Sequence, residues 1–238
     1  MCEYFILTKS SNSKIDDNKS NQIITTETDK NVFILPKNNI KYYLDYGLFE
    51  NNLIEWCKIF SDNKTNMLDI GSHTGTYAIS LARNFNHVYA FEPQKMTFYS
   101  LCGSIALSNL KNVTCFNFGL GSENQLGKQK LNIISLDGGG STLFGNKNNN
   151  IAEEEIEIKT LDSLDLKNIS FIKMDVEDNE LNVLLGSVNT LINSNYPKIL
   201  FEMNQTNNDL INFLHNLHYN IVKITYSSNM FLAEKQKN

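Results

Sequence analysis

An acidic residue and two glycines lie close together in the segment MLDIGSHTG, residues 67–75. Asp69 ends a short apolar run, and the turn that follows it contains Gly71 and Gly75. An apolar pattern with helical spacing, YAISLA, begins after the turn. A strand, a glycine turn and a helix N-terminus in this order are typical of a site for a nucleoside-bearing cofactor, because glycine allows close backbone approach and the helix start favours an anion.

The spacing of the glycines indicates which class of cofactor the site binds. The turn reads G-x-x-x-G, whereas a dinucleotide site has G-x-G-x-x-G, and this difference argues against an NAD-type oxidoreductase. An acid at the strand end would repel a pyrophosphate and hold an amino group, while the helix start would hold a carboxylate. S-adenosyl-L-methionine carries both groups at its methionine end. We expect that end to bind at Asp69, Gly71, His73 and Gly75.

Two later strand ends extend this site. Glu92 lies 23 residues after Asp69 and ends the run HVYAF, close to the offset of about 20 residues at which an acid binds ribose hydroxyls. A solvated strand end or a helix cap is the alternative for either acid taken alone. The third predicted strand ends in residues that we expect beside the adenine, although an ordinary strand end fits them equally well: Asn117, Phe118 and Gly119.

Alternating strands and helices are expected to position these residues, in a parallel sheet with helices on both faces. Strands are predicted at 67–70, 87–91, 113–118, 169–174 and 198–201, and helices at 74–83, 96–109, 180–192 and 209–217. Two extended runs, 219–226 and 229–234, predict a terminal hairpin. Residues 122–157 interrupt the alternation, and we expect a lid or a disordered loop there, with an edge strand around Ile156 and Ile158.

The chain divides into three parts by composition. Residues 1–30 are polar and predict a disordered arm, and residues 31–64 predict a helical extension with a short strand at 32–35. The core domain is expected at 65–238. The net charge of −5 and the lack of clustered Lys and Arg argue against duplex DNA as a partner. The four cysteines form no CxxC pair and no apolar run approaches a membrane span, so we expect a cytoplasmic protein without disulfides.

Several motifs in order resemble the FkbM family of S-adenosylmethionine-dependent methyltransferases. They are LDIGSHTGTYAISLA, VYAFEP, TLDSL, FIKMDVEDNELNVLLGS and PKILFEMN, within about residues 45–234. The resemblance implies a Rossmann-like class I methyltransferase fold, α/β, with a seven-stranded mostly parallel sheet, an antiparallel last strand and helices on both faces. It also implies methyl transfer, commonly onto a hydroxyl oxygen. The chain departs from the family pattern at His73, where Asn is usual, and at Asp178, where Gly is usual.

A third group of polar residues follows two of the predicted central strands. Asp175 and Glu202 end neighbouring strands, where open α/β sheets bind ligands. Methylation of a hydroxyl requires removal of its proton, and Asp175 or Glu177 is the candidate base. Glu202 and Asn204 are expected to bind the acceptor. By analogy with catechol-type methyltransferases, Asp175, Glu202 and Asn204 could instead hold Mg²⁺. A third reading is that these acids cap helices, as expected for Glu180.

These patterns together predict O-methylation of a hydroxyl by S-adenosyl-L-methionine. The acceptor is expected to be a glycan, a ribose or a small molecule. Two alternatives stay open: a catalytically inactive S-adenosylmethionine-binding module within a larger complex, and, less favoured, an NAD-type oxidoreductase.

Overall fold

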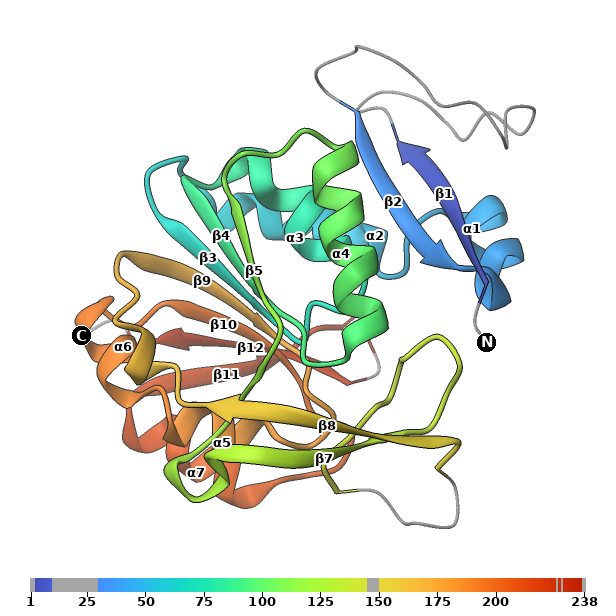
Figure 1. Ribbon diagram of the computed structural model, residues 1–238. Helices are drawn as coiled ribbons and strands as arrows, with labels where there is room; N and C mark the ends of the chain where they lie inside the picture. The colour runs from blue at the N-terminus through green and yellow to red at the C-terminus, as the bar shows by residue number, and fades with distance from the viewer. Residues whose placement is uncertain (1–2, 10–29, 145–149, 226, 228, 237–238) are drawn as a thin grey trace.

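A seven-stranded sheet forms the centre of the computed structural model, which describes residues 3–9, 30–144, 150–225, 227 and 229–236 (Figure 1). The strand order is β11-β12-β10-β9-β3-β4-β5. Strand β12 is antiparallel to β10 and β11, and the other neighbouring pairs are parallel. The strands are β3 (Asn66–Ile70), β4 (His87–Phe91), β5 (Val113–Phe116), β9 (Ile169–Met174), β10 (Lys198–Glu202), β11 (Tyr219–Lys223) and β12 (Met230–Lys235). This confirms the predicted sheet, its antiparallel last strand and the terminal hairpin.

Helices cover both faces of this sheet because alternate residues of each strand point to opposite sides. In β3, Met67 packs with the first helix group, whereas Leu68 and Ile70 pack with the second. Figure 1 shows the two groups on opposite sides of the sheet. The first comprises α2 (Asn51–Cys57), α3 (Thr76–Leu81) and α4 (Lys95–Leu107), and the second comprises α5 (Glu180–Leu185), α6 (Val188–Asn193) and α7 (Asn208–Asn216).

The helix predicted at 180–192 is two short helices instead of one. They are separated at Gly186 and Ser187, where a Cβ on Gly186 would lie 2.1 Å from the carbonyl oxygen of Gly121. The apolar stripe predicted a continuous helix, because hydrophobic periodicity carries no information about this contact between distant residues. Short 3₁₀ turns complete the helical elements: η1 (Lys37–Asn39), η2 (Lys58–Phe60), η3 (Ala82–Asn84), η4 (Glu123–Gln125) and η5 (Asp162–Leu164).

Part of the segment expected to be a lid or loop, residues 122–157, is ordered sheet. Strands β6 (Gly119–Leu120), β7 (Gly127–Ile133) and β8 (Ala152–Lys159) form a second sheet in the order β6-β8-β7. Its buried face carries Leu131, Ile133, Ile156 and Ile158. The loop predicted around residues 146–149 lies outside the described residues. A strand is confirmed around residue 156 as β8, but the predicted edge position is wrong, because β8 lies between β6 and β7 and pairs with both.

The N-terminal part corrects the expectation of an unstructured arm at residues 1–30. Strand β1 (Tyr4–Lys9) pairs antiparallel with β2 (Asn31–Pro36), and residues 10–29 lie outside the described part. The extension 31–64 therefore begins with a strand and continues into α1 (Ile40–Tyr46) and α2. The backbone N–H groups of Val32 and Ile34 donate to the hydroxyls of Ser108 and Ser104, each over 2.8 Å. These bonds fix β2 along α4 and make the extension part of one core with the sheet.

No helix in the described ranges is both long enough and apolar enough to cross a membrane.

Candidate functional site

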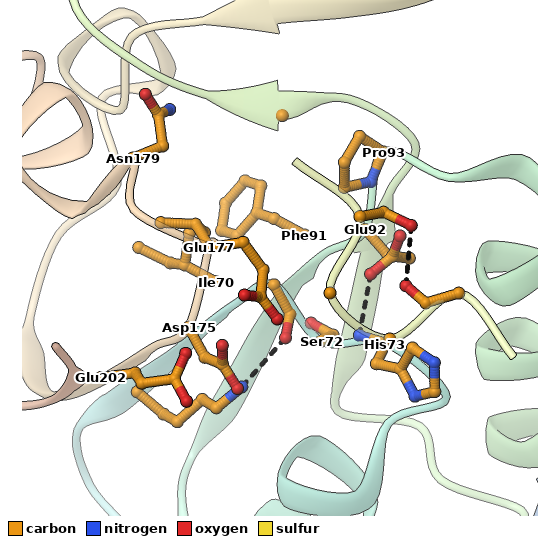
Figure 2. A pocket seen from close by; sticks show the side chains of 18 of the residues that line it. Ile70, Ser72, His73, Phe91, Glu92, Pro93, Asp175, Glu177, Asn179 and Glu202 are labelled. Carbon is orange, nitrogen blue, oxygen red and sulfur yellow. Dashed lines mark hydrogen bonds and ion pairs between the residues drawn. The ribbon is translucent and has the colours of Figure 1, made fainter. Parts of the chain in front are cut away.

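A cavity of about 450 Å³ lies at the carboxyl ends of β3, β4, β9 and β10. Its volume is in the range of roughly 300–1,000 Å³ that small-molecule and cofactor sites usually have. Residues of the glycine turn and Glu92 form one end, and three carboxylates form the other (Figure 2). The segment 137–141 and residues of the N-terminal extension complete the wall. Elements distant in sequence thus meet at the sheet edge where the strand-end residues were predicted to gather.

The turn after β3 needs glycine for two structural reasons. Gly71 and Gly75 have φ values of +75° and +88°, a region that other residues rarely adopt. A Cβ on Gly71 would lie 1.8 Å from the carbonyl oxygen of Asp175, and one on Gly75 would lie 2.4 Å from Leu101. Gly71 was predicted to allow approach of a ligand. It lines the cavity, but the backbone that approaches it most closely is that of the strand end at Asp175.

Asp69 takes a different place from the one predicted. Its side chain is completely buried behind the cavity wall, and its Oδ2 accepts the backbone N–H of Ala78 in α3 over 2.9 Å. Its Oδ1 has no hydrogen-bond partner and lies 3.8 Å from the ammonium of Lys173. Burial raises the pKa of Asp69 to about 6 against the opposing effect of Lys173. The predicted contact with an amino group is therefore wrong, and Asp69 instead joins α3 to the turn.

Glu92 lies at the cavity, as predicted, and also holds the turn. It accepts the backbone N–H of His73 and of Gln94, each over 2.8 Å, and the hydroxyl of Thr97 over 3.0 Å. A carboxylate has about four acceptor positions, so one remains for a ligand hydroxyl. Its exposed fraction is 6%, and this burial raises the pKa of Glu92. The ribose contact of Glu92 remains a prediction that this geometry allows.

The three residues expected beside the adenine have different surroundings. Gly119 lines the cavity. The side-chain amide of Asn117 donates to the carbonyls of Glu92 and Pro93, both over 3.0 Å. The ring of Phe118 is buried against aromatic neighbours in the core. Asn117 and Phe118 thus shape the strand ends, and the expectation that they bind the adenine directly is corrected.

The acidic end of the cavity brings together three side chains that the sequence singled out. Carboxylate oxygens of Asp175, Glu177 and Glu202 all lie within 4.8 Å of one another. Burial, then the charges of Asp175 and Glu177, raise the pKa of Glu202 to about 8. Burial and Asp175 also raise the pKa of Glu177. The predicted proximity of these strand-end acids is confirmed, and the pKa of Glu202 suits proton transfer near neutral pH.

Asn204 does not line the cavity wall with them. It is exposed, and its amide donates to Oε2 of Glu202 over 2.9 Å. The predicted acceptor contact of Asn204 is therefore replaced by support of Glu202. Glu180 accepts the backbone N–H of Val176 over 3.1 Å and so holds the loop before α5, whereas α5 begins after Asn179 without a side-chain cap, so the predicted capping role is not found. Asp178 has a φ of +73°, which lies in the left-handed region that glycine adopts without strain. This explains why a glycine is usual at that position.

His73 lies in the turn after β3, residues 71–75, which is called the cofactor turn below. It connects this turn to the segment 137–142 beside the cavity. Its Nε2 lies 2.7 Å from the carbonyl oxygen of Asp137, so this nitrogen carries the proton. At the other end of the same segment, the hydroxyl of Thr142 donates to the carbonyl of Glu177 over 2.9 Å. The carboxylate of Asp137 accepts from the amide of Asn38 over 2.8 Å. The segment thus lies along the cavity, within the residues 122–157 where a lid or loop was predicted.

Sequence reasoning missed several residues at the cavity. The residues that line it but were not predicted as site residues are Lys173, Tyr43, Phe49 and Glu50. For Lys173 the available signal was a single charge within the apolar run ISFIKM. For the aromatic pair no local signal existed, because the N-terminal extension reaches the site only through tertiary packing.

The profile of the methyltransferase FkbM domain matches residues 69–222 of the chain. No curated protein sequence matches it. Among solved structures, the methyltransferase FkbM of Methylobacillus flagellatus KT is similar, with 17% identity and a TM-score of 0.53. The similarity covers 72% of this chain and 44% of that one, so this chain spans less than half of that protein.

Two further structures share the fold. The precorrin-6y C5,15-methyltransferase of Geobacter metallireducens GS-15 has 10% identity and a TM-score of 0.51, with 79% of this chain and 90% of that chain covered. A putative rRNA-methylase of Clostridium thermocellum has 11% identity and a TM-score of 0.50, with 78% and 94% covered. At such identities these structures show the fold alone. From the profile match and this fold together, the chain belongs to the FkbM methyltransferase domain family and has the Rossmann-like fold of class I methyltransferases.

Proposed function

We propose that this chain is an S-adenosyl-L-methionine-dependent methyltransferase that acts on a hydroxyl oxygen. One observation carries the proposal. The cavity has a glycine turn and Glu92 at one end and the carboxylates of Asp175, Glu177 and Glu202 at the other (Figure 2). A cofactor site and a candidate base therefore share one enclosed space, which an O-methyltransferase needs.

The residues at the turn end fit S-adenosyl-L-methionine. The cavity volume suits a cofactor, Glu92 retains an acceptor position for a hydroxyl, and Gly119 lines the cavity wall beside Pro93. Gly71 and His73 would border the methionine end, Glu92 the ribose, and Gly119 the adenine. When bound, the cofactor supplies a methyl group on a sulfonium that is already a good leaving group. The FkbM family match supports the same cofactor.

The acidic end supplies a base for the acceptor hydroxyl. Glu202 shares a hydrogen bond with Asp175, and its pKa of about 8 suits proton transfer near neutral pH. We infer that the Asp175–Glu202 pair takes the hydroxyl proton, with Glu177 beside it. Positioning of acceptor and cofactor in one cavity supplies about 7–11 kcal/mol of the barrier. The sequence favoured Asp175 or Glu177, and the geometry adds Glu202 to the base.

The charge and the aromatic wall of the cavity favour a neutral acceptor. Glu50, Asp175 and Glu177 line it, and a phosphate close to these carboxylates would be repelled. Tyr43 and Phe49 line the side formed by the N-terminal extension, and the exposed fraction of Phe49 is 39%. Aromatic faces of this kind stack on flat or apolar ring surfaces. Of the predicted acceptor classes, a sugar, a ribose or a small hydroxylated ring fits this wall.

A labelled methyl-transfer screen tests the proposal. Purified protein is incubated with methyl-labelled S-adenosyl-L-methionine and panels of glycans, nucleosides, capped RNA and small hydroxyl compounds. Transfer to a hydroxyl of a neutral acceptor supports the proposal. Cofactor binding without transfer to any acceptor supports the alternative of an inactive binding module, and binding of NAD alone would identify an oxidoreductase.

Metal dependence is tested in the same screen. The three carboxylates are hard oxygen ligands of the kind that Mg²⁺ accepts, so chelation with EDTA followed by Mg²⁺ addition forms a separate arm. Because the carboxylate pair can act as the base itself, we expect transfer to continue in EDTA. Loss of transfer in EDTA and recovery with Mg²⁺ would replace the base proposal with a metal site.

A cytoplasmic location remains part of the proposal. The described cysteines Cys57, Cys102 and Cys115 are free thiols, as expected in a reducing compartment. Thiol titration of the protein in cell extracts, compared with fractionation of those extracts, tests this location.

A further inference from the structure

Lys173 is an unusual residue for the centre of a parallel sheet. It is the one charged residue of β9, its exposed fraction is 4%, and its neighbour across the ladder in β3 is Asp69. Its ammonium lies 5.3 Å from the ring centroid of Tyr77 in α3, within the range of a cation–π contact. Lysine is almost never fully buried unless it is paired, so a specific set of partners must hold it here.

The ammonium of Lys173 contacts three parts of the site at once. It donates to the carbonyl oxygen of Gly71 over 2.9 Å, which places it directly beneath the cofactor turn. It lies 3.5 Å from Oδ2 of Asp175 at the acidic end and 3.8 Å from Oδ1 of Asp69. The ammonium thus makes one hydrogen bond, to Gly71, and two ion pairs, with Asp175 and Asp69. The turn and the acidic end are thus joined by a single side chain.

The surroundings keep this lysine charged. Burial alone would lower the pKa of Lys173, but Asp175, Asp69 and Glu50 together hold that pKa above its ordinary value. Lys173 in turn opposes the effect of burial on the pKa of Asp69. Removal of the cation would leave buried carboxylates without compensation, which is costly in a protein interior. The lysine therefore has an electrostatic role as well as a packing role.

We propose that Lys173 is a positioning residue for methyl transfer, which sets the cofactor turn through Gly71 and the acceptor-side carboxylate through Asp175. The part that concerns Asp175 rests on the proposed function. The part that concerns Gly71 rests only on the geometry of the turn. A loss of Lys173 is therefore expected to impair cofactor binding and methyl transfer separately.

Three substitutions at residue 173 separate charge from hydrogen bonding. Lys173→Arg keeps both, Lys173→Gln keeps a donor without charge, and Lys173→Met keeps neither. The affinity for S-adenosyl-L-homocysteine is measured by calorimetry, and the methyl-transfer rate is measured at saturating S-adenosyl-L-methionine. Lys198→Met is the control, because Lys198 forms an ion pair with Glu234 in the adjacent strand but lies outside the cavity.

We expect Lys173→Met to weaken S-adenosyl-L-homocysteine binding about tenfold, as for loss of one charged hydrogen bond. Lys173→Gln is expected to retain more of that affinity, because its amide can still donate to Gly71. Both neutral variants are expected to lose methyl transfer by at least about tenfold at saturating cofactor, because Asp175 loses its cation. The Lys198→Met control is expected to stay within about threefold of wild type in both measurements, and Lys173→Arg, which keeps the charge in a larger group, is expected to lose less than Lys173→Met.

The outcomes distinguish this inference from the proposed function. Unchanged affinity in a folded Lys173→Met protein would overturn the role at the cofactor turn. Equal loss of transfer in Lys173→Met and Lys198→Met would overturn the role at Asp175. If the wild type binds S-adenosyl-L-homocysteine but methylates no acceptor, the proposed function fails while the affinity series still tests Lys173. If the Lys173→Met protein does not fold, the double variant with Asp69→Asn removes both buried charges, and the same tenfold loss of affinity is expected.

Discussion

Replacement of Glu202 by Gln tests the acidic end of the cavity through stability and activity together. Gln has nearly the same shape and can keep a contact with the amide of Asn204. It removes the charge that burial, Asp175 and Glu177 disfavour. The substitution is therefore expected to stabilise the protein while it removes part of the candidate base. Opposite effects on folding and on catalysis are not expected of a residue with a purely structural role.

The magnitude for stability follows from the pKa of Glu202, which is about 8 in the folded protein against 4.5 for an ordinary glutamate. Each unit corresponds to about 1.4 kcal/mol, so the full difference is roughly 5 kcal/mol. The side chain is only partly buried, and solvent screening reduces this to about 1–2 kcal/mol. We expect Glu202→Gln to raise the free energy of unfolding by about that amount at pH 8 and above.

The direction of the pKa shift of Glu202 also determines the pH range in which the stability changes. A folded pKa above the unfolded pKa means that the folded state binds the extra proton, so the wild type loses stability as the pH rises from about 4.5 to about 8. The advantage of Glu202→Gln is therefore absent near pH 4, grows across this window, and is constant above pH 8. Denaturant titrations at pH 5, 7 and 8.5 measure it. Glu155→Gln is the control, because Glu155 is exposed and pairs with Lys128 on the β7–β8 sheet.

The expected effect on the methyl-transfer rate also depends on the carboxyl group of Glu202. If the Asp175–Glu202 pair takes the hydroxyl proton, the wild-type rate rises with pH through about 8, and Glu202→Gln removes this rise. The rate is expected to fall by about 10²–10⁴, the usual contribution of a general base. A variant that is destabilised equally at all three pH values would refute the electrostatic reasoning. A variant that keeps both the wild-type rate and its pH dependence would refute the role in catalysis.

Three further substitutions test the turn. Glu92→Ala is expected to weaken S-adenosyl-L-methionine binding in calorimetry by at least about tenfold, because it removes charged hydrogen bonds worth about 1.5–3 kcal/mol. His73→Asn is expected to raise the KM for the cofactor severalfold and to speed hydrogen exchange around Asp137, because its ring no longer reaches that carbonyl. Gly71→Ala is expected to abolish folding in circular dichroism, since its Cβ would lie 1.8 Å from a backbone oxygen, whereas Gly127→Ala, at a similar φ in open space, costs only about 1–2 kcal/mol.

Each of these tests has a result that contradicts it. Equal cofactor affinity in Glu92→Ala and wild type would remove Glu92 from the site. Unchanged exchange of the segment that spans the cavity in His73→Asn would show that other contacts hold this segment closed. Equal stability of Gly71→Ala and Gly127→Ala would show that the turn can move away from β9.

Local sequence patterns predicted the sheet because each element has its own period of burial. Apolar runs in β3, β4, β9 and β10 and the spacing of the helices between them predicted a parallel sheet, and the family resemblance implied that its last strand is reversed. The pattern failed for strands whose pairing partner lies beyond an intervening stretch of the chain. Strand β1 and the β7–β8 ribbon are examples, since each is stabilised by a partner far along the chain.

The location of the site also followed from the sequence, because the carboxyl ends of parallel strands must meet at one edge. Glu92, Asp175, Glu177 and Glu202 lie there as predicted. The direction of each side chain did not follow, because it depends on which neighbouring groups need a hydrogen-bond partner. Asp69 turns inward to accept the N–H of Ala78, and Asn117 and Asn204 serve other residues of the site instead of the cavity.

The segment at residues 67–75 shows most clearly what the sequence determined and what only the tertiary structure decided. Its glycines and its place between a strand and a helix were sufficient to predict a cofactor site from the sequence alone. Only the tertiary structure shows that Gly71 packs on the strand end at Asp175, that Glu92 holds His73, and that the ammonium of Lys173 lies beneath the turn. A residue type and its spacing determine which local conformation is allowed, whereas contacts between distant strands determine which atoms remain free to bind a ligand.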